Sequence, residues 1–373
     1  MRAIGIVLAG GNSKRMRELS NKRAIAAMPI AGSYRSVDFA LSNMTNSHIQ
    51  SVAVLTQYNS RSLNEHLSSS KWWDFGRKQG GMYVFPPMIT AESSDWYRGT
   101  ADALYQNLDF LKRSHEPYVV IASGDGIYKL DYNKVLEHHI EKKADITVVC
   151  KEMGADEDVT RFGLVKVNDD GRINDFEEKP MVATSNTISC GIYVIRRRQL
   201  IELIERCAAE DRYDFVTDIL VRYKNLKRIY AYKLDTYWSN IASVDAYYKT
   251  NMDFLKPEVR KYFFKEYPEV YSKVDDLPPA KYNPGATVKN SLVSSGCILN
   301  GLVESSVLFK KVYVGNNCVI KNSIILNDVY IGDNTVIENC IVESRDTIRA
   351  NTTHIGTPDN LKVVVEKNER FTL

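Results

Sequence analysis

Short apolar segments alternate with amphipathic ones along the first part of the chain. Seven segments have the length and the apolar, β-branched composition of strands: 3–9, 51–58, 118–123, 144–151, 162–167, 191–197 and 228–234. Between two of them, residues 100–114 place four apolar side chains on one helical face, with Thr100 as the expected N-cap. This alternation predicts a Rossmann-like α/β fold over 1–245. We expect a mostly parallel sheet with helices on both faces and ligands at the carboxyl ends of its strands.

The hydrophobic pattern changes after about residue 283. The segment VYVGNNCVI (312–320) recurs as VYIGDNTVI (329–337), and apolar residues return about every sixth position with Gly, Asn and Asp between them. Such short repeats predict a parallel β-helix over 283–373, whose coils stack around one core and turn at left-handed corners. A β-sandwich is the less favoured alternative. Residues 246–282, helical at first and then rich in proline and aromatic residues, are interpreted as a helical connector.

Composition and charge narrow the class of protein. The chain has 373 residues and a formal net charge of +3, which is too small by itself to indicate a nucleic-acid partner. No apolar run approaches the ~18 residues of a membrane-spanning helix, so we expect no membrane association. The six cysteines are scattered without a Cys/His cluster, which argues against zinc and is typical of reduced thiols in the cytosol. We therefore expect a cytoplasmic protein.

Three loops carry residues suited to phosphate or metal chemistry. Gly10 and Gly11 follow the first strand, where backbone N–H groups can approach a phosphate, and Arg15 could reach over it. An ordinary strand-to-helix turn is the alternative. Asp125 follows the strand 118–123 and suits a divalent cation, or it caps the next helix. Glu178 and Lys179 could contact a sugar phosphate, or they form a solvated charge run.

A set of motifs, in order along the chain, resembles the glucose-1-phosphate adenylyltransferase (ADP-glucose pyrophosphorylase) family. They include LAGG (8–11), YRSVDFALSN (34–43), TQYNSRSLNEH (56–66), WYRGTADALYQN (96–107), SGDGIYKLDY (123–132), DFEEKP (175–180), SCGIYV (189–194), YDFVTDIL (213–220) and YWSN (237–240). The resemblance implies a nucleotidyltransferase domain, a left-handed parallel β-helix and a tetramer. It also implies the formation of ADP-glucose and pyrophosphate from ATP and glucose 1-phosphate, with Mg²⁺, in glycogen biosynthesis.

The resemblance further implies roles for individual residues. Arg15 would be catalytic, and Asp125 would be catalytic and hold the metal. Nucleotide binding is implied for Gly10, Gly11, Gly99 and Thr100. Substrate contacts are implied for Tyr97, Glu178, Lys179, Ser189, Asp214 and Phe215. Lys22 aligns with a lysine linked to allosteric activation in related enzymes, although a solvated surface lysine is an equal alternative.

Several positions depart from the family pattern around the reacting phosphates. Ile25 and Ser33 replace two lysines, and Asn240 replaces the second metal-binding aspartate; Ser13 replaces a glycine and Gly126 a histidine. Losing one partner of a buried charged contact costs about 2–5 kcal/mol. The residues with implied substrate contacts, from Tyr97 to Phe215, match the family pattern better than these positions do. The chain therefore resembles the regulatory-type subunit of some Gram-positive bacteria, the glycogen biosynthesis protein GlgD.

The leading hypothesis is therefore a non-catalytic or weakly catalytic regulatory subunit. It would activate a catalytic adenylyltransferase subunit in a heterotetramer, with self-association as the other arrangement and ATP, glucose 1-phosphate or sugar-phosphate effectors as ligands. The alternative is an active enzyme in which Asn240 and water complete an altered metal site. Two further alternatives are less favoured: an interaction module that binds no nucleotide, and an acyltransferase, for which the repeats offer only His354.

Overall fold

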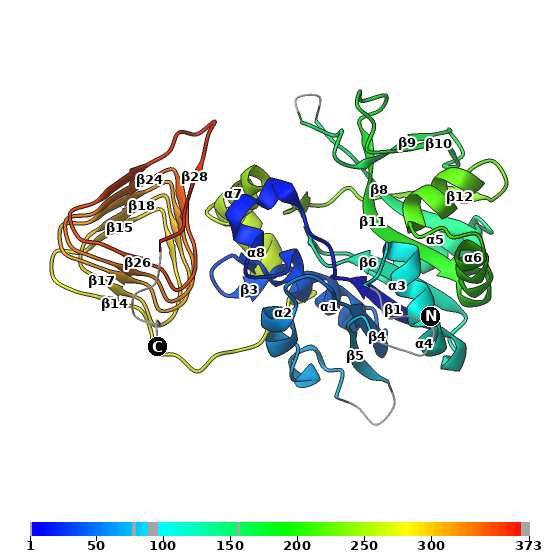
Figure 1. The fold of residues 1–373 in the computed structure, drawn as a ribbon, viewed down its shortest axis with the longest axis horizontal. Helices are drawn as coiled ribbons and strands as arrows, with labels where there is room; N and C mark the ends of the chain where they lie inside the picture. Colours follow the sequence, from blue (N-terminus) through cyan, green and yellow to red (C-terminus); the bar gives the residue numbers. More distant parts are fainter. Residues whose placement is uncertain (1, 77–79, 89–95, 155–156, 367–373) are drawn as a thin grey trace. The chain divides into compact units, whose positions relative to one another are not determined.

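A computed structural model describes residues 2–76, 80–88, 96–154 and 157–366 (Figure 1). The chain splits into two compact units. Unit 1 comprises Met1–Gly11 and Phe39–Trp238, and unit 2 comprises Asn12–Asp38 and Ser239–Leu373. The short N-terminal segment 12–38 therefore packs with the C-terminal part of the chain, so the units, unlike the predicted boundaries, are not contiguous in sequence.

Unit 1 is built on a nine-stranded sheet with the order β10-β9-β11-β6-β1-β4-β5, in which β8 pairs with β11 and β12. Neighbours β6, β1, β4 and β5 are parallel, as are β8 and β12, whereas β11 runs antiparallel to β6 and β8. The predicted α/β fold is confirmed. Its strands are β1 Ala3–Leu8, β4 Ser51–Leu55, β5 Gly81–Phe85, β6 Tyr118–Ser123, β8 Ile146–Glu152, β9 Gly163–Val167, β10 Ile173–Glu178, β11 Thr187–Arg196 and β12 Ile229–Lys233.

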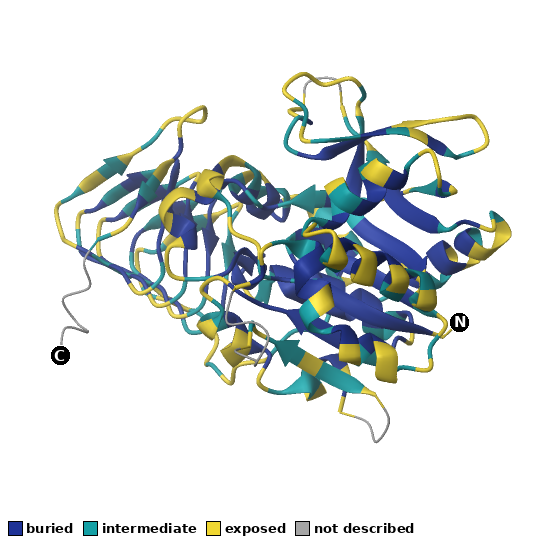
Figure 2. Cartoon of the chain, turned by 45° about the vertical axis from the view of Figure 1, so that its right-hand side comes forward, coloured by how far each residue is buried: buried dark blue, intermediate teal, exposed yellow. Residues whose placement is uncertain are grey.

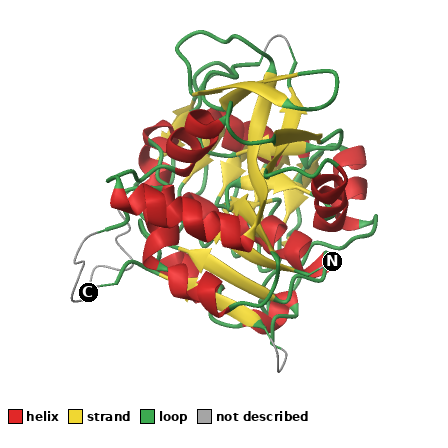
Figure 3. Ribbon diagram, turned by 90° about the vertical axis from the view of Figure 1, so that its right-hand side faces the viewer, coloured by secondary structure: helices red, strands yellow, loops and turns green. Residues whose placement is uncertain are grey.

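Helices flank these strands (Figure 3), and the central strands are buried (Figure 2). Helices α3, α4 and α6 bury leucines in one core with Ile4 and Ile6 of β1. The helical elements are α1 Ser36–Asn46, α2 Arg61–His66, the 3-10 helix η3 Ser70–Trp73, α3 Thr100–Gln106, α4 Leu108–Arg113, α5 Tyr132–Glu141, α6 Arg197–Ala209 and the π-helix η4 Val216–Val221. The helix predicted over 100–114 is interrupted at Asn107, and its N-cap is Gly99 rather than Thr100. The cap prediction was therefore wrong.

Unit 2 contains the β-helix, built from three five-stranded parallel sheets. One sheet holds β14 Lys281–Tyr282, β17 Ile298–Leu299, β20 Tyr313–Val314, β23 Tyr330–Ile331 and β26 Thr347–Ile348. The second holds β15 Thr287–Lys289, β18 Leu302–Glu304, β21 Val319–Lys321, β24 Val336–Glu338 and β27 Thr353–Ile355. The third holds β16 Leu292–Val293, β19 Val307–Leu308, β22 Ile324–Ile325, β25 Cys340–Val342 and β28 Lys362–Val364.

Left-handed corners close the coils, as the repeats predicted. Asn317, Asn334 and Asn351 have φ values of 55°, 57° and 61°, a region that asparagine tolerates better than most residues. Their side chains also form a ladder, because Asn317 donates to Asn334 at 3.2 Å and Asn334 donates to Asn351 at 2.9 Å. The left-handed β-helix is thus confirmed, and these three asparagines mark the same corner in three successive coils.

The outer face of the third sheet is covered within unit 2. Val307, Ile324 and Ile341 are buried, although they lie outside the core cluster of the β-helix. The hydroxyl of Ser294 donates to the carbonyl of Gly32 at 2.8 Å, so the segment 12–38 contacts this face. The same unit contains η1 Lys14–Ser20, η2 Ile25–Ala27, β2 Pro29–Ile30, β3 Tyr34–Arg35, α7 Val244–Asp253 and α8 Pro257–Phe264.

A buried ion pair also ties the segment 12–38 to the β-helix. Arg23 pairs with Glu343, and the two side chains are only 11% and 1% exposed. The hydroxyl of Tyr248 on α7 donates to the carbonyl of Asn322 at 2.7 Å.

Two short strands, β7 Gly126–Tyr128 and β13 Trp238–Asn240, complete the secondary structure. Over the described residues we find no helix with the length and hydrophobicity needed to cross a bilayer.

Candidate functional site

The glycine loop leaves β1 where a side chain would have little room. A Cβ atom on Gly10 would lie 3.0 Å from Cβ of Gln57, whereas one on Gly11 would meet nothing within 4 Å. A side chain at position 10 would therefore crowd Gln57, so the packing of the loop favours glycine there. Gly11 instead faces open space, where its backbone is accessible to a ligand.

Asp125 lies just beyond β6, as the sequence predicted. Its Oδ1 accepts a hydrogen bond from the hydroxyl of Ser123. The alternative role of Asp125 as a helix cap is wrong, because Asp131 caps α5 by accepting from the backbone N–H of Asn133 at 2.9 Å. Asp125 is thus free of a capping role and stands at the carboxyl end of a central strand.

Glu178 and Lys179 form a paired unit at the end of β10. Nζ of Lys179 lies 2.9 Å from Oε1 of Glu178, and the lysine side chain stays 65% exposed. Burial lowers the pKa of Lys179, but the hydrogen bond to Glu178 and the charges of Asp214 and Asp125 outweigh it, so the pKa is raised. The charges of Glu178, Asp214 and Asp125 therefore all act on Lys179, while its side chain remains solvent-exposed.

Ser189 and Phe215 both contact the buried Tyr193. The hydroxyl of Ser189 donates to that of Tyr193 at 3.4 Å, and the ring of Tyr193 lies 5.2 Å from that of Phe215. Burial raises the pKa of Tyr193, and the charges of Glu178 and Asp214 add to the rise. Ser189 and Phe215 thus both contact Tyr193, on whose hydroxyl the charges of Glu178 and Asp214 act.

Gly99 and Thr100 hold the loop that carries Asp214. A Cβ on Gly99 would lie 2.4 Å from the carbonyl oxygen of Tyr213, so only glycine fits there. The hydroxyl of Thr100 accepts from the backbone N–H of Phe215 at 2.8 Å and donates to Oδ2 of Asp214 at 3.4 Å. In this structure Gly99 and Thr100, which the resemblance assigns to the nucleotide, contact the sugar-side loop.

Tyr97 is buried, and its hydroxyl is engaged by the protein. It donates to the carbonyl of Phe85 at 3.2 Å and accepts from the side chain of Asn107 at 2.9 Å. The carbonyl of Tyr97 accepts from Gln57, the residue that limits the space at Gly10. Tyr97 therefore links the glycine loop to α3.

Within unit 2, the two departures at Ser13 and Asn240 meet at one residue. The hydroxyl of Ser13 donates to the carbonyl oxygen of Ala242 at 2.7 Å. Oδ1 of Asn240 accepts from the backbone N–H of the same Ala242 at 3.0 Å. The amide oxygen of Asn240, which the family resemblance would turn toward a metal, is thus used inside its own loop.

The remaining candidates in the segment 12–38 differ in exposure. Arg15 and Ser33 are exposed, and the Arg15 guanidinium makes no hydrogen bond or ion pair with any residue that the structure describes. Ile25 is buried at 4% exposure. Lys22 is exposed, and its charge acts on the buried carboxyl of Asp346. Arg15 is available to a ligand, while Ile25 is part of the core.

Among the described residues, neither unit by itself offers a dedicated Mg²⁺ site. Such an ion prefers several carboxylate or water oxygens in octahedral geometry. Within unit 1, Asp125 is a carboxylate at the end of β6, and within unit 2 the neutral amide oxygen of Asn240 already accepts a hydrogen bond. Across the described ranges, no group of three His, Cys, Asp or Glu side chains gathers as a metal site would require.

Known proteins share both parts of the chain. The nucleotidyl transferase family matches residues 4–257, and the GlmU-like C-terminal hexapeptide family matches residues 278–365. A glucose-1-phosphate adenylyltransferase of Clostridium botulinum (strain Eklund 17B / Type B) is 41% identical over 370 residues, covering 98% of this chain and 95% of the relative. The enzyme of the same name from Pseudothermotoga lettingae is 39% identical over 322 residues, covering 86% of this chain and 76% of the relative. The chain therefore belongs to the glucose-1-phosphate adenylyltransferase family.

Proposed function

We propose that this chain is a regulatory subunit of ADP-glucose pyrophosphorylase with little or no activity of its own. It would bind sugar phosphate, retain a weak nucleotide site and raise the activity of a catalytic adenylyltransferase subunit in glycogen biosynthesis. The observation that carries the proposal is the hydrogen bond that the amide oxygen of Asn240 accepts. This oxygen is neutral and accepts from Ala242, so the site lacks the second carboxylate that would neutralise a metal.

The loss of cationic groups supports the same function. Phosphoryl transfer depends mainly on positioning and on neutralising the charge that develops on the phosphates. Ile25 presents a buried apolar side chain where the family resemblance implies a lysine, and Ser33 is neutral as well. Each such loss costs about 2–5 kcal/mol, a factor of roughly 30 to several thousand in rate, and the losses need not add.

The sugar side retains its charges. Glu178 and Lys179 are paired at 2.9 Å, and Asp214 and Asp125 act on the same lysine. A carboxylate next to a lysine suits a sugar phosphate, because the carboxylate accepts from sugar hydroxyls and the ammonium pairs with the phosphate. The chain would therefore bind glucose 1-phosphate without transferring an adenylyl group efficiently.

A second candidate is an active adenylyltransferase with an altered metal site. It is favoured by the identity of 41% over 95% of the length of a protein named as that enzyme. It is also favoured by the exposed Arg15, whose guanidinium has no partner among the residues that the structure describes. In this case Asn240 and water would complete the coordination of Mg²⁺, and the chain would work as a homo-oligomer.

An activity assay separates the two candidates. The purified chain is assayed alone for ADP-glucose formation, and it is then titrated into the catalytic adenylyltransferase subunit from the same cell. A regulatory subunit gives little turnover alone and raises the turnover of its partner. A measurement of molecular mass then detects an oligomer that contains both chains. Turnover of the lone chain close to that of the partner would overturn the proposal and favour the active enzyme.

A further inference from the structure

The loop that carries Asp214 is held from one side by α3. The carbonyl of Tyr213 accepts from the backbone N–H of Ala101 at 2.7 Å, and the backbone N–H of Phe215 donates to the hydroxyl of Thr100 at 2.8 Å. These contacts anchor the residues on both sides of Asp214. They leave the backbone N–H of Asp214 itself to a partner on another element.

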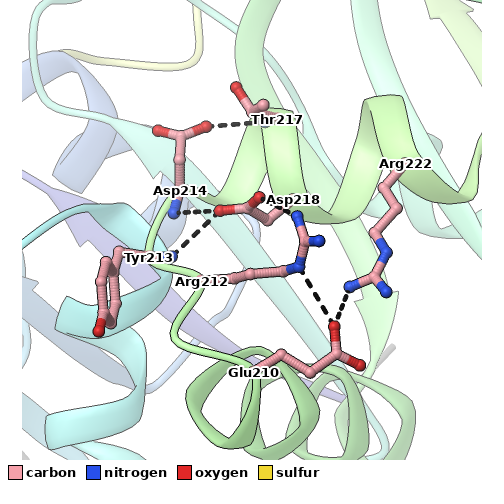
Figure 4. Close-up of polar contacts among 7 residues, drawn as sticks. All are labelled: Glu210, Arg212, Tyr213, Asp214, Thr217, Asp218 and Arg222. Atoms are coloured by element: carbon pink, nitrogen blue, oxygen red, sulfur yellow. Dashed lines mark hydrogen bonds and ion pairs between the residues drawn. The ribbon is translucent and has the colours of Figure 1, made fainter.

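That partner is Asp218 of η4. Its Oδ2 accepts from the backbone N–H of Asp214 at 2.9 Å and from that of Tyr213 at 3.1 Å, and Oδ1 pairs with Arg212 at 3.2 Å (Figure 4). The Asp218 side chain is only 15% exposed. One oxygen of this side chain thus holds two successive backbone N–H groups, which fixes the backbone of the loop.

The backbone in turn fixes the direction of the Asp214 carboxylate. Oδ1 of Asp214 accepts from the backbone N–H of Thr217 at 2.7 Å, and Oδ2 accepts from Thr100 at 3.4 Å. The charge of Asp214 acts on Lys179 in this arrangement. If the loop moves, both the sugar-side carboxylate and its lysine lose their relative placement.

We propose that Asp218 is a positioning residue for sugar-phosphate binding, acting through the loop that presents Asp214. This inference rests on the proposed function, because it takes glucose 1-phosphate as the ligand. The role requires an oxygen acceptor at the right distance and not the negative charge as such, because both backbone N–H groups go to a single oxygen atom of Asp218.

Four variants test this role. Asp218→Ala removes the acceptor, Asp218→Glu keeps the charge but displaces it by one methylene, and Asp218→Asn keeps an oxygen in place. Glu210→Gln is the matched control. Glu210 pairs with Arg212 and Arg222 on the outside of the same network (Figure 4) but accepts from neither loop N–H. Calorimetry gives the affinity for glucose 1-phosphate and for ATP, and thermal unfolding gives the Tm of each full-length variant.

The expected pattern is selective. Asp218→Ala and Asp218→Glu should weaken glucose 1-phosphate binding about tenfold or more with ATP affinity unchanged, whereas Asp218→Asn and Glu210→Gln should bind both ligands as the original chain does. If Asp218→Ala fails to fold, the contrast between the Glu and Asn variants carries the test. Equal sugar-phosphate affinity in the Glu and Asn variants would overturn the inference, as would an equal loss of both ligands. If the unaltered chain binds no glucose 1-phosphate, the proposed function fails instead.

Discussion

Ser13 and Ala242 are joined by a hydrogen bond of 2.7 Å, although 229 residues separate them in the chain. Ala242 also donates its backbone N–H to Asn240. Two positions at which the chain departs from its family are therefore coupled through one residue. A glycine at position 13 could not make the first bond, so the side chains of Ser13 and Asn240 belong to one local arrangement.

The first prediction concerns this bond. Ser13→Ala should lower the free energy of unfolding by about 1 kcal/mol, because it leaves the partly buried carbonyl of Ala242 without its side-chain donor. Denaturant unfolding measures the change. Ser33→Ala is the control, since Ser33 is exposed in the same segment and should leave stability within the error. Equal stabilities of the two variants would contradict the prediction.

The second prediction concerns restored chemistry. In Asn240→Asp, the new carboxylate can still accept from Ala242 and adds the missing charge, so stability should be kept. Combined with Ile25→Lys, it should raise the Mg²⁺-dependent turnover of the lone chain by roughly 30-fold or more. The lysine alone should lower the Tm, because Ile25 is buried and an unpaired ammonium is costly there.

The control for Ile25→Lys is a second substitution at the same position. Ile25→Met keeps an apolar side chain of similar volume and should alter neither Tm nor turnover appreciably. If the double variant folds and binds Mg²⁺ yet shows no gain in turnover, the regulatory interpretation loses its physical basis.

The third prediction concerns the glycine loop. Gly11→Ala meets no atom within 4 Å, so the Tm should be unchanged. The added methyl group would nevertheless stand where a phosphate must approach the backbone, and ATP affinity should fall about tenfold or more. Gly76→Ala is equally unhindered but lies outside the site, so it should leave both quantities unchanged. Calorimetry with ATP decides, and unaltered affinity in Gly11→Ala would place the nucleotide elsewhere.

The fourth prediction concerns pH. Burial raises the pKa of Asp346 to about 6, helped by the charges of Glu343 and Glu366 and opposed by Lys22 and by the backbone N–H of Glu366. Because the folded state then binds more protons than the unfolded state between about pH 4 and 6, stability falls as pH rises through that window. At pH 7, ionisation of this carboxyl lowers the free energy of unfolding by on the order of 3 kcal/mol.

Asp346→Asn should therefore stabilise the protein at pH 7.5 and have little effect near pH 4. Urea unfolding at the two pH values measures the difference between the variant and the original chain. Asp328→Asn, at an exposed corner of the same β-helix, serves as the control and should show no such pH-dependent gain. A stabilisation of Asp346→Asn that is the same at both pH values would exclude titration of this carboxyl as its cause.

Local repetition made the β-helix predictable, while long-range packing did not reveal itself in the sequence. The corner residues Asn317 and Asn334 recur seventeen positions apart, as the repeat indicated. Strand β10 was missed because it carries DFEEKP, whose charged residues mask the alternation of an edge strand. Thr100 was misassigned as a cap because its actual partners, Asp214 and Phe215, lie more than a hundred residues away.

The same limit explains the residues of the site that sequence reasoning did not single out. Asp218 stands four positions after Asp214 in YDFVTDIL. Its spacing was a usable signal, because an acidic side chain in the first turn of a helix can accept from N–H groups at the start of that helix. The approach of Ser13 to Ala242 had no such signal, since it depends on the complete packing of unit 2.

The membership of residues 12–38 in unit 2 has a consequence for biosynthesis. Residues 12–38 are synthesised before Glu343 and Ser294, which pair with Arg23 and Gly32. Residues 12–38 therefore cannot complete their packing until the coils of the β-helix have formed. Truncation of the repeats would remove the scaffold from the N-terminal loop as well, so a shortened chain would lose far more than its C-terminal coils.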